Sequence, residues 1–171
     1  LTIKHLLSAY DKTLIIDADG LNALAKYGTD ILKTANCRVV LTPHAKEFSR
    51  LTGIDVKTIT DNPVNCALDF ANEYKVTVLL KGADSIIADG ARIAINKRGT
   101  TALAKAGSGD MLSGFMCGCA ARGLEPFDAA VCASYTLGVS AEITSLQKTD
   151  YCATAKDILN NIHNAVKRLT K

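Results

Sequence analysis

A glycine-rich segment near the middle of the chain has the residue types and spacing of a phosphate-binding turn. Residues 104–114 read AKAGSGDMLSG, in which Gly107, Ser108 and Gly109 precede a run with helical character. The first turn of a helix leaves backbone N–H groups without partners, and the helix dipole adds positive potential there. Phosphate is the natural ligand of such groups. The segment lacks the GxxxxGK[ST] and GxGxxG patterns, so neither a P-loop nor a dinucleotide fingerprint is predicted.

Asp110 is the unusual residue of this segment, because its carboxylate would repel a bound phosphate. Removal of the proton from a hydroxyl group that attacks phosphorus would account for its presence. The alternative is structural: Asp110 or Ser108 caps the helix, and the glycines allow close packing against a sheet. The spacing alone leaves both interpretations open.

Two further polar clusters follow apolar runs that predict strands. Lys81 and Gly82 come after VTVLL, where the ammonium group could bind a nucleotide phosphate and the glycine would let the backbone approach it. An ordinary hairpin connection with a solvated lysine is the alternative. His44 follows RVVLTP in the first turn of a predicted helix, whose positive end favours a neutral, hydrogen-bonding imidazole. A surface or capping histidine is the alternative there.

A fourth cluster places Asp17, Asp19 and Asn22 after the first predicted strand. Paired carboxylates could bind Mg²⁺ through water, because Mg²⁺ prefers oxygen ligands and keeps part of its hydration shell. Asx turns that cap the next helix explain the same residues equally well. Four polar clusters that each follow or precede a regular element are better evidence for a site than any one of them.

Short apolar runs alternate with helical segments over the first half of the chain, the pattern of a parallel sheet covered on both faces. Strands are predicted at residues 13–17, 38–42 and 76–80, with helices from about 21 and 44 and at 64–74. In residues 85–96, SIIADGARIAIN, the dipeptide Asp89-Gly90 predicts a tight hairpin turn with positive φ angles. The sheet should therefore end in an antiparallel edge.

Three helices are predicted after this hairpin, at residues 110–121, 127–143 and 153–169. The last carries an apolar stripe formed by Ile158, Leu159, Ile162, Val166 and Leu169. Together the elements predict an α/β fold with three α/β/α layers, a mainly parallel sheet, an antiparallel hairpin at one edge and a helical C-terminal third. Ligands of such folds bind beyond the carboxyl ends of the strands, where the polar clusters lie.

Length and composition predict one compact domain over residues 1–171. With 48% hydrophobic and 22% charged residues, the chain has enough apolar material for a core. A formal net charge of +3, 5% aromatic residues and no Trp disfavour a nucleic-acid partner. No apolar run reaches the roughly 18 residues of a membrane span, so no membrane partner is expected.

The cysteines are predicted to be small buried residues rather than zinc ligands, because they form no CxxC pair. The six are Cys37, Cys66, Cys117, Cys119, Cys132 and Cys152. This pattern, without a signal peptide, favours a reducing, cytoplasmic setting.

Four motifs occur in order along the chain: DADGLNAL, LTPHAKEFSRLTG, LLKGADSIIADG and NKRGTTALAKAGSGDMLSG. From Leu14 to about Ser140 they resemble the NAD(P)H-hydrate dehydratase family, a branch of the ribokinase-like superfamily. The resemblance implies an ADP/ATP-dependent hydro-lyase that restores hydrated NADH or NADPH, with Mg²⁺ as cofactor. The histidine of TPH is similar to that of the bacterial branch, which implies ADP as donor, with AMP and phosphate as products.

The resemblance also assigns residue roles. The implied nucleotide-binding residues are Lys81, Gly82, Ala83, Asp84, Ser85, Gly107, Ser108 and Gly109. His44 and Asp110 match hydrate-binding positions, with Asp110 also the base, and Asn22 and Asp19 belong to a further family signature. Relatives often read TPHPGE where residues 42–47 of this chain read TPHAKE, so the turn after the histidine is expected to differ.

Relatives carry a substantial N-terminal part, with further strands, before the DADGLN motif. The chain is therefore expected to be the C-terminal portion of the family domain. The resemblance implies small-molecule partners and a homo-oligomer, with a tetramer as the expected assembly. Two alternatives stay open: a ribokinase-like vitamin-precursor kinase that releases a stable phosphate ester, and a catalytically silent nucleotide-binding module.

Overall fold

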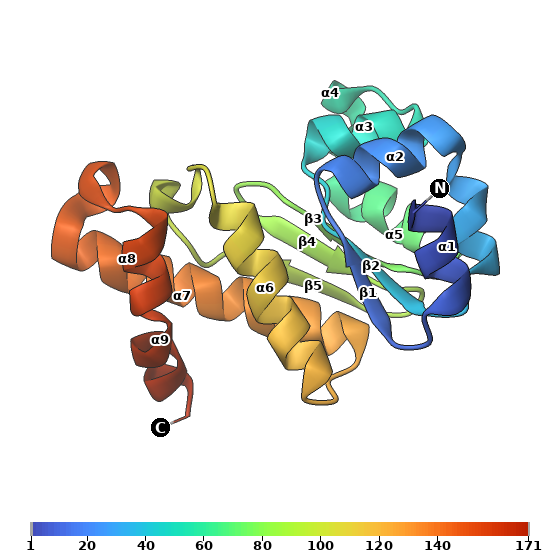
Figure 1. Ribbon diagram of the computed structural model, residues 1–171. Coiled ribbons are helices and arrows are strands. Elements are labelled where there is room, and N and C mark those ends of the chain that lie inside the picture. The colour runs from blue at the N-terminus through green and yellow to red at the C-terminus, as the bar shows by residue number, and fades with distance from the viewer. Residues whose placement is uncertain (1, 171) are drawn as a thin grey trace.

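A five-stranded sheet forms the centre of the molecule, as seen in a computed structural model that describes residues 2–170 (Figure 1). The strands lie side by side in chain order: β1 (Thr13–Ile16), β2 (Arg38–Leu41), β3 (Thr77–Leu80), β4 (Ser85–Ala88) and β5 (Ile93–Asn96). β1, β2 and β3 pair in parallel, whereas β4 pairs antiparallel with β3 and with β5. All but β4 therefore run in one direction. The predicted fold, with its antiparallel hairpin at one edge, is confirmed.

Helices cover both faces of this sheet (Figure 1). One side carries α1 (Thr2–Ala9), α2 (Asp19–Tyr27), the 3₁₀ helix η1 (Thr29–Thr34), α3 (Ala45–Thr52), α4 (Val56–Asp61) and α5 (Pro63–Tyr74). The elements after β5 lie on the other side: η2 (Thr101–Leu103), α6 (Ser108–Ala121), α7 (Pro126–Cys152), α8 (Ala155–Asn160) and α9 (Ile162–Leu169).

Local sequence explains where several of these helices begin and end. Gly53 ends α3 in the left-handed region, with φ 74. The Asp55 carboxylate accepts the N–H of Lys57 at 2.8 Å and so caps α4. Pro63 begins α5, where its missing N–H leaves no helical hydrogen bond unmade.

Successive residues of β1 to β4 enter different cores, because strand side chains alternate between the two faces of a sheet. In the edge strand β5, Ile93 and Ile95 are exposed instead. In β2, Val39 and Leu41 pack in the core beneath α3 and α5, whereas Val40 packs beneath α6 and α7. β3 repeats the pattern with Val78 on the first face and Leu79 on the second. Both faces of the central strands are thus buried, which is why their sequences are continuously apolar.

The hairpin between β4 and β5 is present, but the predicted turn geometry is wrong. Neither Asp89 nor Gly90 has a positive φ. Instead the Asp89 carboxylate accepts the backbone N–H groups of Ala91 and Arg92 at 3.1 and 2.9 Å, and the Arg92 guanidinium at 2.7 Å. These hydrogen bonds stabilise a longer loop than the two-residue turn that the dipeptide predicted.

The prediction of one helix over residues 153–169 is also wrong, because Asn161 separates α8 from α9. The buried Asn161 amide donates to Thr144 Oγ1 at 3.0 Å and to Gln147 Oε1 at 2.9 Å, both on α7. These contacts stabilise a break that periodicity alone does not reveal. The helix predicted at 127–143 continues to Cys152, with a bend at Thr149.

Most of the apolar stripe predicted for the last helix is not buried. Ile158 is buried in the core, but Leu159, Val166 and Leu169 are exposed. A stripe at helical spacing shows that one face is apolar, and it does not show that another element covers that face.

The prediction that all six cysteines are buried is wrong for two of them. Cys37 is buried, Cys117 and Cys152 are exposed, and the others are half-buried. Burial raises the pKa of the Cys119 thiol to about 11, and the neighbouring Cys132 adds to the rise. An apolar run on a helix includes outward positions, so residue type alone could not assign the two exposed thiols.

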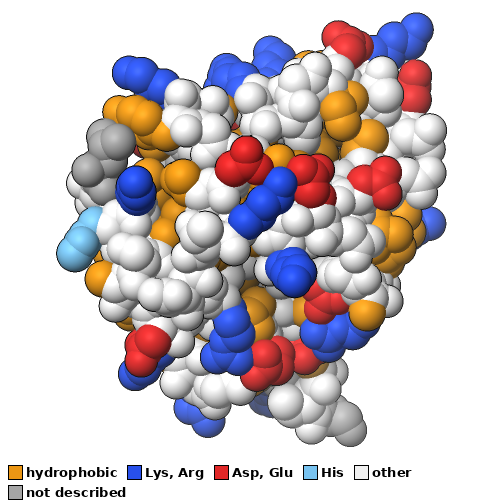
Figure 2. Space-filling model, turned by 90° about the vertical axis from the view of Figure 1, so that its right-hand side faces the viewer, with side chains coloured by type: hydrophobic (Ala, Val, Ile, Leu, Met, Phe, Trp, Pro, Cys, Tyr) orange, Lys and Arg blue, Asp and Glu red, His pale blue; other side chains and the backbone are white. Residues whose placement is uncertain are grey.

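Within the described part of the chain, no helix combines the length and the apolar character that a membrane crossing requires. On the face drawn in Figure 2, basic and acidic side chains are interspersed. This agrees with the small formal net charge of +3.

Candidate functional site

Three parallel strands bring charged side chains from distant parts of the sequence to the same edge of the sheet. Asp17 follows β1, His44 lies just beyond β2, and Lys81 follows β3. The Lys81 ammonium group donates to Asp17 Oδ1 at 2.9 Å and lies 3.9 Å from Glu47 Oε2. The prediction that the polar clusters meet at the carboxyl ends of the strands is confirmed for these residues.

The ion pair between Asp17 and Lys81 is largely shielded from solvent, with side-chain exposures of 18% and 26%. Burial raises the pKa of Asp17, but the hydrogen bond and charge of Lys81 lower it, helped by the Ala18 N–H and the Thr42 hydroxyl. The net effect is a pKa below the ordinary value, so Asp17 is ionised at neutral pH. Lys81 is therefore not the solvated lysine of an ordinary hairpin.

The backbone next to Asp17 is strained. Ala18 has φ 47 and ψ −115, a conformation that costs a non-glycine residue on the order of 1–3 kcal/mol. In return, its N–H donates to Asp17 Oδ1 at 2.9 Å. No side chain caps α2 at this point, so the Asx-turn explanation of this cluster is not realised. The strain serves to hold the carboxylate.

His44 is the N-cap of α3 and forms a capping box with Glu47. The ring Nδ1 accepts the Glu47 N–H at 3.1 Å, and the Glu47 carboxylate accepts the His44 N–H at 2.9 Å. Because Nδ1 is an acceptor, the ring proton of the neutral imidazole lies on Nε2. Nε2 is 3.5 Å from Glu47 Oε1 and can donate there or to a ligand. The capping alternative is realised, and it fixes the ring orientation.

Glu47 was not among the residues singled out from the sequence. Its side chain is only 10% exposed and lies between His44 and Lys81. The signal that could have found it is the spacing of a capping box, with the N-cap residue followed three positions later by a glutamate. Histidine is not one of the usual N-cap residues, so the pattern was not evident.

The first turn of α6 has no side-chain cap. Gly107 is the N-cap, in the left-handed region with φ 88, and no side chain accepts the first N–H groups. The alternative in which Asp110 or Ser108 caps this helix is therefore not realised. The Ser108 hydroxyl is buried and has no hydrogen-bond partner among the described residues. The Ser108 N–H donates to the Lys105 carbonyl at 3.3 Å, whereas the N–H groups of Gly109 and Asp110 have no acceptor among the described residues. These two amides beside an unpartnered hydroxyl form a site that an anion can satisfy.

The start of α6, residues 107–109, is called the anion cradle below. Gly109 joins it to the Asp17–Lys81 ion pair at the strand ends. A Cβ atom on Gly109 would lie 3.2 Å from Asp17 Oδ2 and 4.0 Å from Lys81 Nζ. One turn further, the Ser113 hydroxyl donates to Asp17 Oδ2 at 3.4 Å. The helix terminus and the Asp17–Lys81 pair therefore form one continuous site, which a larger side chain at 109 would crowd.

A cavity of about 800 Å³ opens on this site. Six of the predicted nucleotide-binding residues line it: Lys81, Gly82, Ala83, Ser85, Ser108 and Gly109. His44 lines it as well. Asp84 and Gly107 do not, although each is part of a segment that does. The two segments, distant in sequence, thus share one cavity.

Asp110 and Asn22 lie outside the cavity lining. Asp110 is exposed in the first turn of α6, directly after Gly109, and its carboxylate accepts no hydrogen bond within residues 2–170. Asn22 is exposed on α2, and its Oδ1 accepts a hydrogen bond from Arg50 Nη1 at 2.9 Å. That contact joins α2 to α3 and does not bring Asn22 into the cavity.

The loop after β5 forms a second wall of the cavity that sequence reasoning did not assign. Arg98 and Thr100 line it from this loop, together with Asn96 at the end of β5 and Ser134 from α7. The Asn96 amide donates to Ser134 Oγ at 2.7 Å. The segment belongs to the fourth motif, but nothing in its residue types indicated that it would face the strand ends across a cavity.

The site fits a Mg²⁺ ion that enters with nucleotide phosphates better than an ion held by a protein cage. Among the described residues, no group of three His, Cys, Asp or Glu side chains is placed to hold a metal. Mg²⁺ typically keeps several waters and uses one or two carboxylates with substrate phosphates. Asp17 does not line the cavity and its two oxygens accept hydrogen bonds from Lys81 and Ser113, so it would meet such an ion only through water.

This architecture, with a cavity at the strand ends and an uncapped helix terminus in its wall, has the fold of a ribokinase-like superfamily protein from Enterococcus faecalis. The TM-score with that structure is 0.76 at 22% sequence identity, over 97% of this chain and 57% of the other. The carbohydrate kinase family profile described as NAD(P)H-hydrate dehydratase matches residues 2–164. The chain therefore belongs to the NAD(P)H-hydrate dehydratase family.

Named relatives agree with this assignment. The bifunctional NAD(P)H-hydrate repair enzyme Nnr of Moorella thermoacetica is 36% identical over 169 residues, which are 98% of this chain and 32% of that enzyme. The Nnr of Salinibacter ruber is 37% identical over 161 residues, 94% of this chain and 29% of the relative. The chain thus spans about a third of the length of these curated relatives.

A solved structure is similar over nearly the whole chain. The ADP/ATP-dependent NAD(P)H-hydrate dehydratase from Bacillus subtilis, co-crystallized with ATP and Mg²⁺, has a TM-score of 0.85 and 31% sequence identity. The match covers 97% of this chain and 58% of the Bacillus chain.

Proposed function

We propose that the protein dehydrates hydrated NADH and NADPH back to NADH and NADPH, with ADP as the preferred phosphoryl donor and ATP as the alternative. The observation that carries the proposal is the uncapped start of α6, where the unpartnered Ser108 hydroxyl and Gly109 line the cavity next to Asp110. Membership of the NAD(P)H-hydrate dehydratase family supports the choice of substrate.

In the first step Asp110 acts as a general base. Its exposed carboxylate takes the proton of the ring hydroxyl, and the oxygen attacks the terminal phosphoryl group of the nucleotide. The bond between that phosphorus and the bridging oxygen breaks, so ADP leaves as AMP. The amides around Gly107 to Gly109 stabilise the negative charge that develops on the phosphoryl oxygens, with the Ser108 hydroxyl in place of its N–H, which donates to the Lys105 carbonyl.

In the second step the phosphorylated hydrate eliminates phosphate. The ring carbon–oxygen bond breaks with phosphate as leaving group, water takes the proton of the adjacent ring carbon, and the electron pair of that C–H bond restores the double bond of NADH or NADPH. Hydroxide is a poor leaving group, which is why the nucleotide is consumed. Products are then NADH or NADPH, AMP and phosphate.

The other residues of the site bind and orient the two substrates. Lys81 and the backbone of residues 82–85 hold the nucleotide, with Lys81 oriented by Asp17. His44 donates from Nε2 to the hydrate, because Glu47 holds its Nδ1 as an acceptor. Mg²⁺, bound with the nucleotide, supplies charge neutralisation on the phosphates.

The proposal includes the setting of the enzyme. The six cysteines are free thiols, which suits a reducing cytoplasm. We further propose that residues 1–171 act as one domain, that the protein does not bind nucleic acid, and that it assembles as a homo-oligomer. Size-exclusion chromatography with light scattering measures the assembly directly.

The test of the mechanism is the variant Asp110→Asn. When the wild-type protein is mixed with hydrated NADH, ADP and Mg²⁺, the near-ultraviolet absorbance of NADH should reappear in the solution while AMP accumulates. Loss of a general base lowers turnover by about 10²–10⁴-fold. The affinity for ADP, measured by calorimetry, should change little, because the amides that hold phosphate remain.

Asp69→Asn, an exposed carboxylate on α5, is the matched control and should keep full activity. Full activity of Asp110→Asn would remove the mechanism. A phosphorylated product that persists would instead identify a kinase, and ADP binding by the wild-type protein without any turnover would identify a silent binding module.

A further inference from the structure

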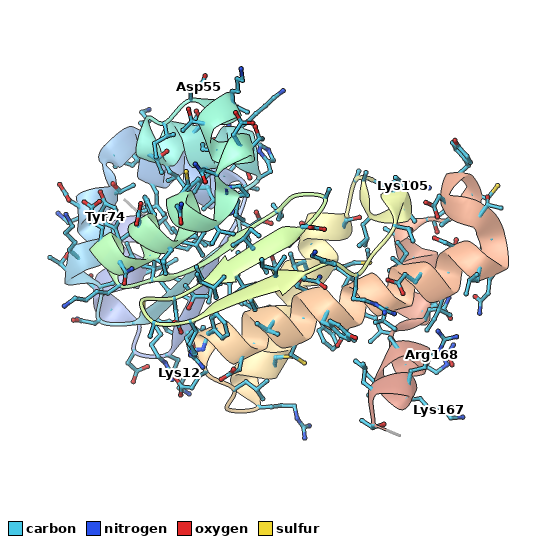
Figure 3. All side chains as sticks on the ribbon, turned by 180° about the vertical axis from the view of Figure 1, so that it is seen from behind. Lys12, Asp55, Tyr74, Lys105, Lys167 and Arg168 are labelled. Carbon is cyan, nitrogen blue, oxygen red and sulfur yellow. The ribbon has the colours of Figure 1, made fainter. Side chains whose placement is uncertain are left out.

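The Lys105 side chain ends among three backbone carbonyl groups. Its ammonium group donates to the carbonyl oxygens of Asp150 at 2.7 Å, of Tyr151 at 3.3 Å, and of Ala153. Figure 3 labels Lys105 in the loop that lies beside the C-terminal part of α7. A lysine ammonium has three N–H donors and no acceptor, so the three carbonyls satisfy it completely.

The carbonyl groups converge because the end of α7 is bent. Thr149 has φ 64 and ψ 159, so the regular helix stops there and residues 150–153 turn back toward α8. Carbonyl groups at the end of a helix have no helical N–H partners and carry partial negative charge. The bend therefore collects three such oxygens around one point, and a cation at that point stabilises the bent conformation.

The same lysine lies two residues before the N-cap of α6. Segment 100–107 is fastened to the end of α7 by three sets of contacts: Thr100 with Ser145 at 2.8 Å, Thr101 with the Asp150 carboxylate, and Lys105 with the carbonyl cage. Beyond these contacts the segment continues into Gly107, Ser108 and Gly109. Lys105 thus connects the carbonyl cage to the anion cradle.

We propose that Lys105 is a positioning residue whose ammonium group is the built-in cation of the cage formed by the carbonyls of Asp150, Tyr151 and Ala153, and that it thereby holds the cradle of α6 in the geometry that takes phosphate. Lys105 lines the cavity, but its three N–H donors are taken up by the carbonyls, so it acts through the cradle and not as a donor to the nucleotide. This inference rests on the proposed function for one point only, namely that the anion bound by the cradle is a nucleotide phosphate.

The first test needs no nucleotide and no activity. Lys105→Ala removes the ammonium group and leaves its space, so propylammonium chloride should raise the unfolding temperature of this variant with saturation. Tetramethylammonium chloride at the same ionic strength has no N–H donor and should not. Neither salt should cause a saturable rise in the unfolding temperature of the wild-type protein or of Lys105→Met, whose apolar side chain fills the same space.

Lys97→Ala, an exposed lysine earlier in the same loop, is the matched control and should respond to both salts like the wild-type protein. Equal responses of Lys105→Ala to propylammonium and tetramethylammonium would overturn the cage as a cation site. This result is independent of whether the protein is a dehydratase.

The second test uses calorimetry to measure the affinities of the protein for ADP, which carries phosphate, and for adenosine, which does not. Lys105→Ala should weaken ADP binding at least tenfold and leave adenosine binding unchanged, and propylammonium should restore most of the ADP affinity. Equal loss for adenosine and ADP, or an unchanged ADP affinity, would contradict the positioning role. If the wild-type protein binds no ADP while the thermal rescue occurs, the proposed function fails and the cation cage stands.

Discussion

The two faces of the sheet are packed in different ways. The face beneath α3 and α5 is filled by large side chains, among them Phe48, Phe70 and Leu41. The face beneath α6 and α7 is richer in alanine, which makes up six of the fourteen buried residues of its core as described: Ala102, Ala129, Ala130, Ala133, Ala141 and Ala153. Large side chains contribute most to the burial of apolar area, whereas small ones let a helix approach closely. We therefore expect the first face to contribute more to stability, while the small residues of the second bring the cavity walls together.

Aromatic contacts distinguish the first face. The rings of Phe48 and Phe70 are 5.4 Å apart at 64°, and Tyr74 lies 4.4 Å from Phe70. Edge-to-face pairs of this kind are favourable beyond the area that they bury. Phe48 is completely buried at the centre of this core.

A single glycine distinguishes the second face. A Cβ atom on Gly138, within α7, would lie 2.7 Å from the backbone C and O atoms of Arg98. The loop after β5 therefore rests directly on the helix, and the Glu142 carboxylate accepts the Gly99 N–H there at 3.0 Å. This close approach places Arg98 and Asn96 in the cavity wall.

The largest expected effect comes from the face with large side chains. Phe48→Ala should lower the free energy of unfolding by about 3–5 kcal/mol, because it removes a buried ring and leaves a cavity. Urea denaturation followed by circular dichroism measures the change. The control Leu159→Ala, on the exposed surface, should stay within about 0.5 kcal/mol of wild type. A loss below about 1 kcal/mol for Phe48→Ala would mean that this face does not dominate stability.

The second prediction tests the close approach on the alanine-rich face. Helix propensity alone would make Gly→Ala in a helix stabilising by about 0.5–1 kcal/mol. Gly138→Ala should instead destabilise the protein by about 1–3 kcal/mol, because its Cβ meets rigid backbone. It should also weaken ADP binding, because the loop with Arg98 must move.

Gly118→Ala is the matched control for that prediction, because a Cβ on Gly118, within α6, meets nothing within 4 Å. Because alanine has the higher helix propensity, this variant should be more stable than the wild-type protein. If both variants are stabilised equally in urea denaturation, the contact between Gly138 and the loop is not a tight one.

The smallest expected effect is electrostatic and belongs to the same face. Hydrogen bonds from Lys148 and Thr154 lower the pKa of Asp157, at the start of α8, to about 2. A carboxylate with a lowered folded-state pKa stabilises the fold above its unfolded value of about 3.9, and this contribution is lost as the pH falls toward 2. Wild type should therefore be more stable than Asp157→Asn at pH 5, and the difference should shrink toward pH 2.

Unfolding free energies of both proteins at intervals between pH 5 and pH 2 measure that difference. A gap that stays constant across this range would show that the side chain acts through the shape of its cap and not through its charge. The control Asp61→Asn, an exposed residue on the other face, should show no comparable trend.

Sequence patterns predicted much of the scaffold and several of the residues that line the cavity. The continuous apolar runs of β2 and β3 indicated strands buried on both faces, and the glycines before Asp110 indicated an open helix terminus. The roles of Glu47 and of the loop after β5 were missed. Their positions depend on which residues meet across the fold, and spacing along the chain carries little information on such contacts.

The errors have the same origin. Asn161 interrupts the last helix because its amide finds partners on α7, and Asp89 shapes its loop through hydrogen bonds that replace a glycine turn. In both places a side chain competes with the local preference of the backbone. A propensity argument that considers only neighbours in sequence cannot weigh such a competition.

The amino-acid sequence by itself determined the order of the strands and of the longer helices, the burial of both faces of the central strands and the glycine turn before Asp110, because periodicity and backbone freedom are local properties. Only the tertiary structure decided that Lys81 pairs with Asp17 and that Lys105 meets the carbonyl groups at the end of α7. Those contacts join residues that are far apart in the chain, and their geometry follows from how the helices pack on the sheet.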